Sequence, residues 1–271
     1  MLATIFTKKI TKNLYCSAMI LSVGLLSACS DTDKETKKST DYATAAIEAN
    51  YSVEVLEGKK VSYVANFGHD GSSLELEAGD KVTVEIGAES LSLIESISSG
   101  TATYRLNRTE TLLASKYFFE FLRETQEDAD GSFVEVPESF SLTSPTSITG
   151  AFRPANGKTF PISWDQRTGG DDDGEEFTIR YDFDCRHDSG TPSISKSYVE
   201  KVEDTGEHLV NLLTVLAENG EVGNYQACSR FNIIAIRSST DGNLDGALKS
   251  GSVVGSQVRT IEGSLEGLQL P

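Results

Sequence analysis

The chain has 271 residues, of which 24 are Lys or Arg and 41 are Asp or Glu, so its net charge is −17. A charge of this sign argues against a nucleic-acid partner, because binding to phosphates needs clustered basic side chains. It also argues against docking on an anionic lipid surface through basic residues. We therefore expect no nucleic-acid partner and no basic membrane-binding face.

The N-terminal region has the pattern of an export signal. Lys8, Lys9 and Lys12 precede an apolar run over residues 14–26, and the first 28 residues include no acidic side chain. The run has about 13 residues, whereas a helix needs about 20 to cross a bilayer. A permanent membrane span is the weaker interpretation, so residues 1–28 are predicted to be a signal peptide that is removed.

The end of this segment resembles the lipobox of bacterial lipoproteins. Leu26, Ser27 and Ala28 are a branched apolar residue and two small residues, and Cys29 follows them. The thiol of such a cysteine forms a thioether with a diacylglycerol, and more than one acyl chain makes anchoring stable. The alternative is an ordinary secretory signal that ends near a chance cysteine. The resemblance implies lipidation of Cys29, and Ser30 favours the outer membrane, with the domain facing the periplasm.

Cysteine usage agrees with export. Removing the signal leaves 21 basic and 41 acidic residues, a net charge of −20, and takes Cys16 away. With Cys29 lipidated, Cys185 and Cys228 remain in an oxidising compartment. We expect a disulfide that stabilises the fold by about 4 kcal/mol on the chain-entropy estimate; the alternative is two buried thiols. A zinc site is less favoured, because Cys185 and His187 are two ligands and zinc takes three or four.

Composition divides the mature chain into a tether and two domains. Residues 29–46, acylated at the first position, are polar and charged with almost nothing to bury, so we predict a disordered tether. The following stretch of about 225 residues is long for one sandwich and suits two small domains. Ser144-Pro145 looks like the seam between them, which places the domains at 47–144 and 145–271.

The predicted domains are all-β, because apolar and polar residues alternate and turn residues recur at short intervals. In the first domain, turns are predicted at residues 68–71 and 79–80. Residues 117–122 have apolar side chains on both faces, so we expect a central strand there. Other inward positions are Val61, Tyr63, Ala65, Leu74, Leu76, Val82, Val84, Ile86, Tyr104 and Leu106.

The second domain shows the same alternation. Strands are predicted at residues 139–142, 160–164, 232–236 and 253–261. One segment differs, since its leucines have helical spacing, and a short helix is predicted to begin near Glu207. Those leucines are Leu209, Leu212, Leu213 and Leu216, and the clearest strand has Phe177, Ile179, Tyr181, Phe183 and Cys185 on one face.

One pattern in the second domain resembles an immunoglobulin-type core. Trp164 lies on an early strand, Cys185 on the next, and Cys228 near the end. In antibody domains the cysteines flank the tryptophan, so the resemblance concerns architecture alone. The expected fold is two immunoglobulin-like β-sandwich domains in tandem, with one short helix in the second.

A second resemblance rests on the spacing of short motifs across most of the mature chain. They are Phe121-Leu122-Arg123, Ser132-Phe133-Val134-Glu135-Val136-Pro137, Ser144-Pro145, Ile162-Ser163-Trp164, Cys185, Cys228, Arg237, Asp241-Gly242-Asn243-Leu244-Asp245 and Val258-Arg259. This spacing is similar to that of uncharacterised proteobacterial envelope lipoproteins built as tandem β-sandwiches. The group implies no activity, so no functional residue is carried over.

The sequence contains no clear catalytic motif. A serine hydrolase would need a G-x-S-x-G elbow, and a phosphate site would need a Gly-rich loop; the chain has neither. His187, Asp188 and Ser189 include the residue types of a triad, but neighbours on one loop cannot adopt its geometry, so a polar turn is the preferred interpretation. Paired carboxylates stay open, because the separation of two acids depends on the fold.

The sharper candidate site is for calcium. Residues 241–246 match the first half of an EF-hand loop, in which Asp241, Asn243 and Asp245 would supply oxygen ligands. Two later positions of the loop do not fit: the twelfth is Ser252, where an EF-hand has a bidentate acid, and the ninth is Lys249, whose charge opposes cation binding. The alternative is therefore an ordinary Gly- and Asp-rich turn. The acidic runs at 127–131 and 171–176 offer further carboxylates or form solvated loops. No cofactor is expected beyond a weak Ca²⁺ ion.

These observations favour a non-enzymatic binding or structural module of the cell envelope, held to the membrane by its N-terminal lipid. Its expected partner is an envelope protein or a polysaccharide. The alternative is a carboxylate-dependent periplasmic hydrolase or another carbohydrate-active protein. That alternative needs two converging acids in a pocket, one of them with a raised pKa.

Overall fold

The computed structural model describes residues 37–77, 79–145, 159–166, 175–187, 194–218, 221–222 and 225–266. The predicted signal peptide, the lipobox residues and Cys29 lie outside the described residues, as do Asp188, Ser189 and residues 171–174 of one acidic run. Within the described part, no helix has the length and apolar character needed to span a membrane. This part of the chain is mostly β-structure, as predicted.

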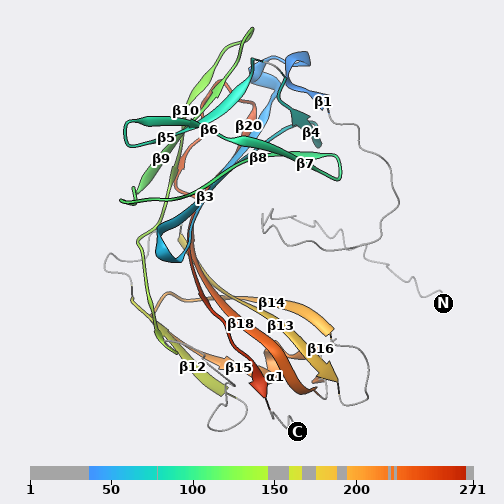
Figure 1. Cartoon of the computed structure of the whole chain (residues 1–271), viewed down its shortest axis with the longest axis vertical. Coiled ribbons are helices and arrows are strands. Elements are labelled where there is room, and N and C mark those ends of the chain that lie inside the picture. Colours follow the sequence, from blue (N-terminus) through green and yellow to red (C-terminus); the bar gives the residue numbers. More distant parts are fainter. Residues whose placement is uncertain are drawn as a thin grey trace, which may run out of the picture. The chain divides into compact units, whose positions relative to one another are not determined.

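A sheet of eleven strands forms the centre of the fold (Figure 1). Its main path is β1-β4-β3-β2-β20-β18-β13-β14, while β8 pairs with β3, β7 with β8 and β21 with β18. Two pairs are parallel, β1 with β4 and β2 with β20. The strands are β1 Lys37–Lys38, β2 Glu48–Val55, β3 Lys60–His69, β4 Ser72–Glu75, β7 Ile94–Ser98, β8 Thr101–Thr109, β13 Glu175–His187, β14 Ile194–Val202, β18 Tyr225–Ser239, β20 Ser250–Ile261 and β21 Leu265–Glu266.

A five-stranded sheet packs on the part of the main sheet that includes β2, β3, β4 and β8, and the first core lies between the two sheets. Its order is β19-β10-β9-β5-β6, so β9 is central, as predicted. Phe118 is nevertheless 42% exposed, so the strand buries one face and not two. The strands are β5 Lys81–Ile86, β6 Glu89–Ser92, β9 Lys116–Leu122, β10 Ala129–Glu135 and β19 Gly242–Asn243, and the largest core side chains are Tyr51, Tyr63, Tyr117, Phe119 and Phe121.

A three-stranded sheet, in the order β11-β12-β15, lies over the second core. The alternating apolar side chains of β12 and β13 are buried there, as predicted. β11 begins at Leu142, whereas the predicted strand began at residue 139. The strands are β11 Leu142–Ser144, β12 Thr159–Trp164 and β15 Glu207–Asn211, and β16 Ala217–Glu218 pairs separately with β17 Glu221–Val222.

The predicted short helix exists, but its expected start near Glu207 is wrong. Residues 207–211 form β15 and pair with β12, with Val210 opposite Phe160. This pairing buries Val210 and leaves Leu209 60% exposed, so strand alternation overrides the helical leucine spacing. The helix α1, Leu212–Val215, starts after Asn211, whose side-chain oxygen accepts from the N–H of Leu213 at 3.0 Å.

The C-terminal part of the chain contributes to both cores. β19 pairs with β10 and β20 with β2, and Leu248 and Val253 lie in the first core. Ile261, at the far end of β20, lies in the second core. The predicted boundary at residue 144 therefore does not separate the two cores, because β20 is long enough to cross from one to the other.

The predicted tether ends earlier than residue 46. Residues 37–46 include β1 and two 3₁₀ turns, η1 Ser39–Asp41 and η2 Thr44–Ala46. Arg123 reaches them from the end of β9: its Nη2 donates to the carbonyls of Ser39 at 2.9 Å and Tyr42 at 3.1 Å. The first ten described residues therefore belong to the folded body.

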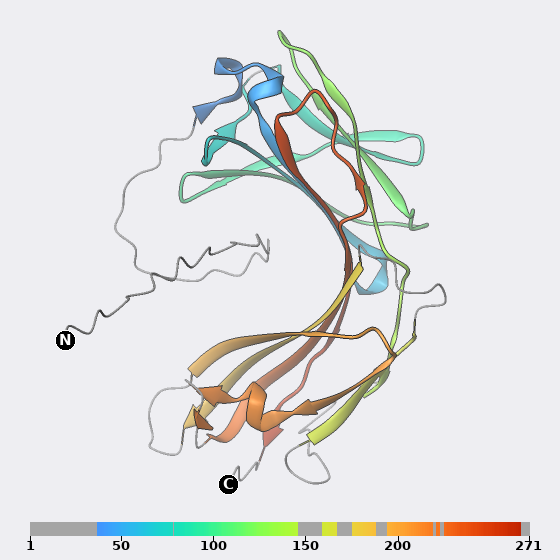
Figure 2. The same cartoon turned by 180° about the vertical axis from the view of Figure 1, so that it is seen from behind.

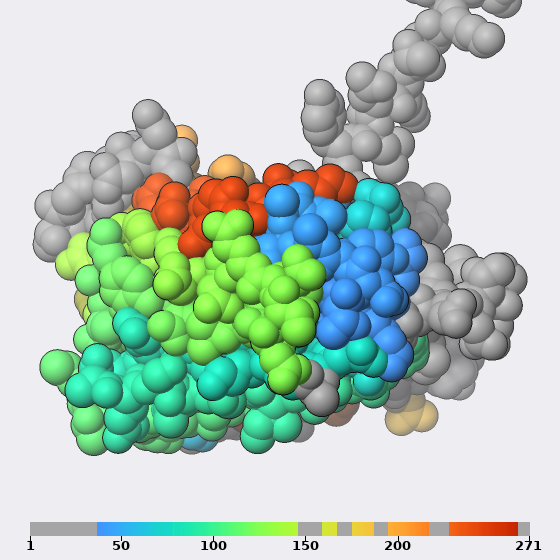
Figure 3. All heavy atoms as spheres, turned by 90° about the horizontal axis from the view of Figure 1, so that it is seen from above, coloured from blue at the N-terminus to red at the C-terminus, as the bar shows by residue number. Residues whose placement is uncertain are grey.

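A buried ion pair holds this N-terminal segment in place. Arg123 Nε lies 2.8 Å from an Asp80 carboxylate oxygen, and neither side chain is more than 2% exposed. The same oxygen accepts from the Ser39 hydroxyl at 2.7 Å. Figure 3 shows the blue residues of this segment beside the green strands β9 and β10 and the red residues of the C-terminal part. The composition of residues 37–46 suggested disorder because the segment has few apolar side chains to bury, whereas the contacts that hold it are made by polar groups.

Candidate functional site

Residues 136–141, here called the connecting segment, join β10 to β11 and run along the core side of the main sheet (Figures 1 and 2). β20 makes room for the chain at Gly255, where a Cβ atom would lie 1.9 Å from the carbonyl oxygen of Glu135. Two residues later, Gln257 Nε2 donates to the carbonyl of Pro137 at 3.2 Å. Side chains of the sheet thus satisfy carbonyls of an irregular segment.

Arg237 on β18 binds the middle of the connecting segment. It is 1% exposed and donates through Nη1 to the Glu138 carbonyl at 3.0 Å and through Nη2 to the Asp165 carbonyl at 3.1 Å. Its Nε lies 2.7 Å from an Asp204 carboxylate oxygen, and Asp204 also accepts from Trp164 Nε1 at 2.6 Å. The charge of this buried arginine is therefore paired with a carboxylate.

Arg259 on β20 binds the end of the connecting segment and differs in its partners. Its Nε donates to the Phe140 carbonyl at 2.8 Å. Nη1 donates to the carbonyls of Val258 at 2.8 Å and Val55 at 3.4 Å, and Nη2 to the side-chain oxygen of Gln257 at 3.3 Å. All four acceptors are neutral groups.

Both arginines also lie over the ring of Phe140. The guanidinium carbon is 4.9 Å from the ring centroid for Arg237 and 5.4 Å for Arg259. A cation over an aromatic face adds about 0.5–2 kcal/mol of attraction. Phe140 is buried, so the two arginines and this ring fix the connecting segment against the sheet.

A wide, open depression of about 840 Å³ lies beside Arg259, and we call it the Arg259 pocket. It is bounded by the 3₁₀ turn η3, Glu57–Lys59, by the connecting segment and by the end of β20. This volume lies in the range of sites for small ligands, about 300–1,000 Å³. The apolar part of the lining is Leu56, Leu113, Leu142 and Ile261, and the polar part includes Glu57, Lys59, Ser139, Ser141, Thr260 and Glu262.

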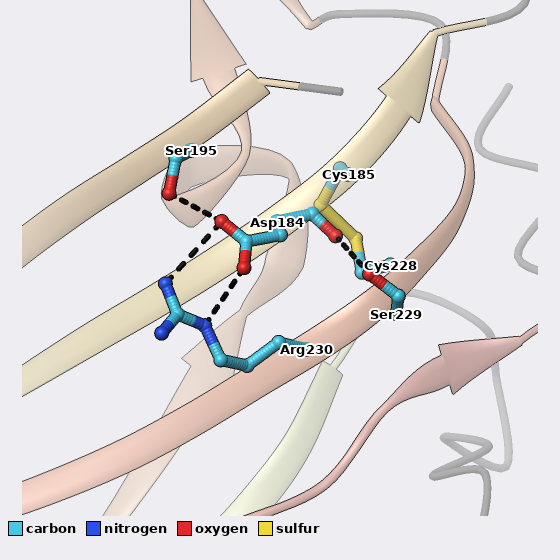
Figure 4. The surroundings of a disulfide bond; sticks show 6 residues. All are labelled: Asp184, Cys185, Ser195, Cys228, Ser229 and Arg230. Atoms are coloured by element: carbon cyan, nitrogen blue, oxygen red, sulfur yellow. Dashed lines mark hydrogen bonds and ion pairs between the residues drawn. A yellow bond between two sulfur atoms is a disulfide. The ribbon is translucent and has the colours of Figure 1, made fainter. Parts of the chain in front are cut away.

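The predicted disulfide between Cys185 and Cys228 is confirmed. The two cysteines are paired neighbours on β13 and β18 at the end of the second core, and both are buried. Figure 4 shows the adjacent ion pair, in which Arg230 Nε lies 2.9 Å from a carboxylate oxygen of Asp184. The bridge links strands whose cysteines are 43 residues apart in sequence.

The residues predicted to hold calcium make other contacts. Asp245 accepts from the N–H groups of Gly131 at 2.6 Å and Ala247 at 2.7 Å, and Asn243 Nδ2 donates to the Gly131 carbonyl at 3.1 Å. The carbonyl of Asp241 accepts from the main chain of β10. These bonds attach β19 to β10, and no group of three or more metal-binding side chains occurs among the described residues. Calcium binding by this loop stays a prediction.

Sequence reasoning missed the structural role of the two arginines, which is to bind the connecting segment. Arg237 and Arg259 appeared in the motif spacing, but no role was assigned to either. The available signal was their position: Arg237 directly follows the predicted strand 232–236, whose last four residues are apolar, and Arg259 is a charged residue within the predicted strand 253–261. A charged side chain among inward positions of a strand needs a buried polar partner.

Comparisons with known proteins identify no family. No protein-family description matches the chain, and no curated protein does. Among solved structures, an Escherichia coli α2-macroglobulin gives 13% identity and a TM-score of 0.23, covering 81% of this chain and 14% of that one. A DUF4785 family protein of Legionella pneumophila is 11% identical with a TM-score of 0.25, and the match covers 70% of this chain and 52% of that one. The titin Ig tandem A164–A165 is 11% identical with a TM-score of 0.22, and the match covers 81% of this chain and 98% of that one. These TM-scores carry no inference about function.

Proposed function

We propose that the protein is a lipid-anchored module of the bacterial cell envelope that binds a ligand in the Arg259 pocket. The observation that carries the binding function is a cavity of ligand size beside an arginine whose four acceptors are neutral. Buried charges in proteins are normally paired, and Arg237 follows that rule. Arg259 is half-buried and, among the described residues, has no carboxylate at ion-pair distance, so it is suited to receive a ligand's polar group.

The proposed anchoring rests on the sequence around Cys29 and on the disulfide. Disulfides persist in oxidising compartments such as the periplasm and are rare in the cytosol, so the Cys185–Cys228 bridge supports export. Leu26, Ser27 and Ala28 support cleavage before Cys29 and its acylation. The proposed location is the periplasmic side of the outer membrane, as in the envelope lipoproteins that the chain resembles.

Membrane fractionation tests the anchor. Cys29→Ala is expected to move the protein from the membrane to the soluble periplasmic fraction, and mass spectrometry of the wild type is expected to find acyl groups on Cys29. Cys16→Ala is the matched control, since Cys16 lies in the predicted signal, and it is expected to stay membrane-bound. Retention of Cys29→Ala in the membrane, or a wild type without acyl groups, overturns the anchoring proposal.

Sorting to the outer membrane has its own test. Ser30→Asp is expected to retain the lipoprotein in the inner membrane, as Asp at this position does in the better-known sorting systems. Density separation of the two membranes measures the change. A wild type already in the inner-membrane fraction contradicts the proposed location but not the acylation.

Binding in the pocket is tested with a variant that fills it. The side chains of Ser139 and Ser141 are exposed and line the cavity, so Ser141→Tyr places a large ring in it without removing a core side chain. Thermal unfolding is measured with neutral sugars, sugar acids, amino acids and short peptides. The proposal expects one class to stabilise the wild type and not the variant; equal responses to every class contradict it.

The hydrolase alternative stays a prediction from the sequence. Two acids, Glu57 and Glu262, line the pocket. Burial raises the pKa of one acid in the described part of the chain, Glu54, which is not part of the lining. Binding is the function proposed here because it rests on the pocket and on the neutral hydrogen-bond partners of Arg259.

A further inference from the structure

In the part of the chain that the structure describes, three buried or half-buried arginines donate to main-chain carbonyls, and Arg259 differs from the other two. Arg123 pairs with Asp80 at 2.8 Å and Arg237 with Asp204 at 2.7 Å. Across the described residues, no carboxylate lies within ion-pair distance of Arg259. Among the described residues, Arg259 thus has neutral hydrogen-bond acceptors only, and its nearest electrostatic counterpart is the carboxylate of Glu57.

The surroundings of Arg259 make that charge unfavourable. Burial lowers the pKa of Arg259, the nearby carboxylate of Glu57 acts in the opposite direction, and the positive charge of Arg237 lowers it further. Nη2 has two N–H groups, and the described residues offer it one acceptor, the Gln257 oxygen at 3.3 Å. An anion placed beside Nη2 would offset the partial desolvation of this half-buried charge and use the remaining donor.

The pocket offers a second set of polar groups around this cation. Glu57 and Glu262 supply carboxylate acceptors, and Ser139 and Ser141 supply hydroxyl groups. The two acids would repel a ligand whose polar groups are all anionic, with no hydroxyl group to donate to them. They are suited to hydroxyl groups of a ligand, which donate hydrogen bonds to carboxylates. The apolar part of the lining can pack against the C–H face of such a ligand.

We propose that the Arg259 pocket binds a hydroxylated carboxylate, such as a sugar acid, with the carboxylate on Arg259 and the hydroxyl groups toward Glu57 and Glu262. This inference names the ligand class of the pocket and rests on the proposed binding function. The same chemistry occurs in a free sugar acid and in an acidic polysaccharide. Both present one carboxylate per sugar ring together with neighbouring hydroxyl groups.

Isothermal titration calorimetry of the purified full lipoprotein in detergent tests the inference. Glucuronate is the first probe, glucose removes the carboxylate, and acetate removes the hydroxyl groups. Glucuronate is expected to bind at least about tenfold more tightly than either of the others. A polygalacturonate chain is the last probe: binding of both acids indicates a polysaccharide ligand, and binding of glucuronate alone indicates a free sugar acid.

Variants assign the binding to the pocket. Arg259→Gln is expected to weaken glucuronate binding about tenfold to a hundredfold, because a charge-assisted contact is lost. Arg230→Gln is the matched control, an exposed arginine beside the disulfide, and its affinity is expected to be unchanged. Because Arg259 also holds the connecting segment, Ser141→Tyr is the second variant; its side chain has no role in that segment, and it is expected to abolish binding.

The outcomes separate this inference from the proposed function. If glucuronate and glucose bind equally well and Ser141→Tyr abolishes the binding of both, the proposed role of the ligand carboxylate is refuted. Binding in the Arg259 pocket is then retained. Glucuronate binding that survives in Ser141→Tyr overturns the site. No binding of any probe up to about 10 mM overturns the ligand class, while acylation of Cys29 and the thermal unfolding series test the proposed function independently.

Discussion

Removing the carboxylate of Asp204 is expected to destabilise the second core strongly. Arg237 donates to it through Nε at 2.7 Å and Nη2 at 3.1 Å, and Trp164 Nε1 donates to it at 2.6 Å. Asp204→Ala leaves a guanidinium that is 1% exposed with carbonyl acceptors alone, and an indole N–H without its acceptor. Removing one partner of a buried ion pair costs about 3–5 kcal/mol of unfolding free energy.

Urea unfolding measures this loss, followed by circular dichroism and by the fluorescence of Trp164, the single tryptophan of the chain. Asp184→Ala is the matched control, because it removes an Asp–Arg pair whose Arg230 side chain is 50% exposed. Its cost is expected to stay below about 1 kcal/mol. Equal losses in the two variants would refute the reasoning, since burial would then make no difference to the value of the pair.

Three other expectations concern the disulfide, the N-terminal segment and one buried acid. Reductant is expected to lower the unfolding free energy of the wild type by about 4 kcal/mol and to leave that of a Cys185→Ala, Cys228→Ala double variant unchanged. Urea unfolding of both proteins with and without reductant measures the difference. Arg123→Met is expected to release the N-terminal segment, so trypsin cleaves faster after Lys38 than in the wild type; equal rates contradict the role of the ion pair. Burial raises the pKa of Glu54, so the folded state binds its proton more tightly and loses stability as the pH rises above 4.5. Glu54→Gln is therefore expected to be more stable than the wild type near pH 7, with the difference vanishing near about pH 4 in thermal unfolding.

Local alternation predicted most strands, because an inward apolar position recurs every second residue whatever the distant contacts are. The β13 strand, with Phe177 to Cys185 on one face, is the clearest case, and its partner cysteine followed from elimination among four. The predicted start of the helix was wrong because it depends on a contact between residues that are distant in sequence. Val210 pairs with Phe160, about fifty residues earlier, and no local pattern contains that contact.

The candidate pocket depends on contacts of the same long-range kind. Arg259 reaches the Phe140 carbonyl across 119 positions of sequence, and Arg237 reaches Glu138 across 99. The sequence marks both arginines as unusual strand residues but does not indicate which carbonyls they meet. The path of β20 through both cores is likewise invisible locally, because Val253 and Ile261 have the same apolar character in either core.

The docked N-terminal segment limits where the protein works, under the proposed anchoring. Lys37 follows Cys29 by eight residues (37 − 29), and eight extended residues reach at most about 28 Å. A free chain to residue 47 would reach about 60 Å. Because Arg123 and Asp80 hold residues 37–46 on the fold, the maximum length of the linker between Cys29 and the folded residues is about half of what it would be otherwise. Under the proposed anchoring, Lys37 is therefore kept within about one bilayer thickness of the acylated cysteine.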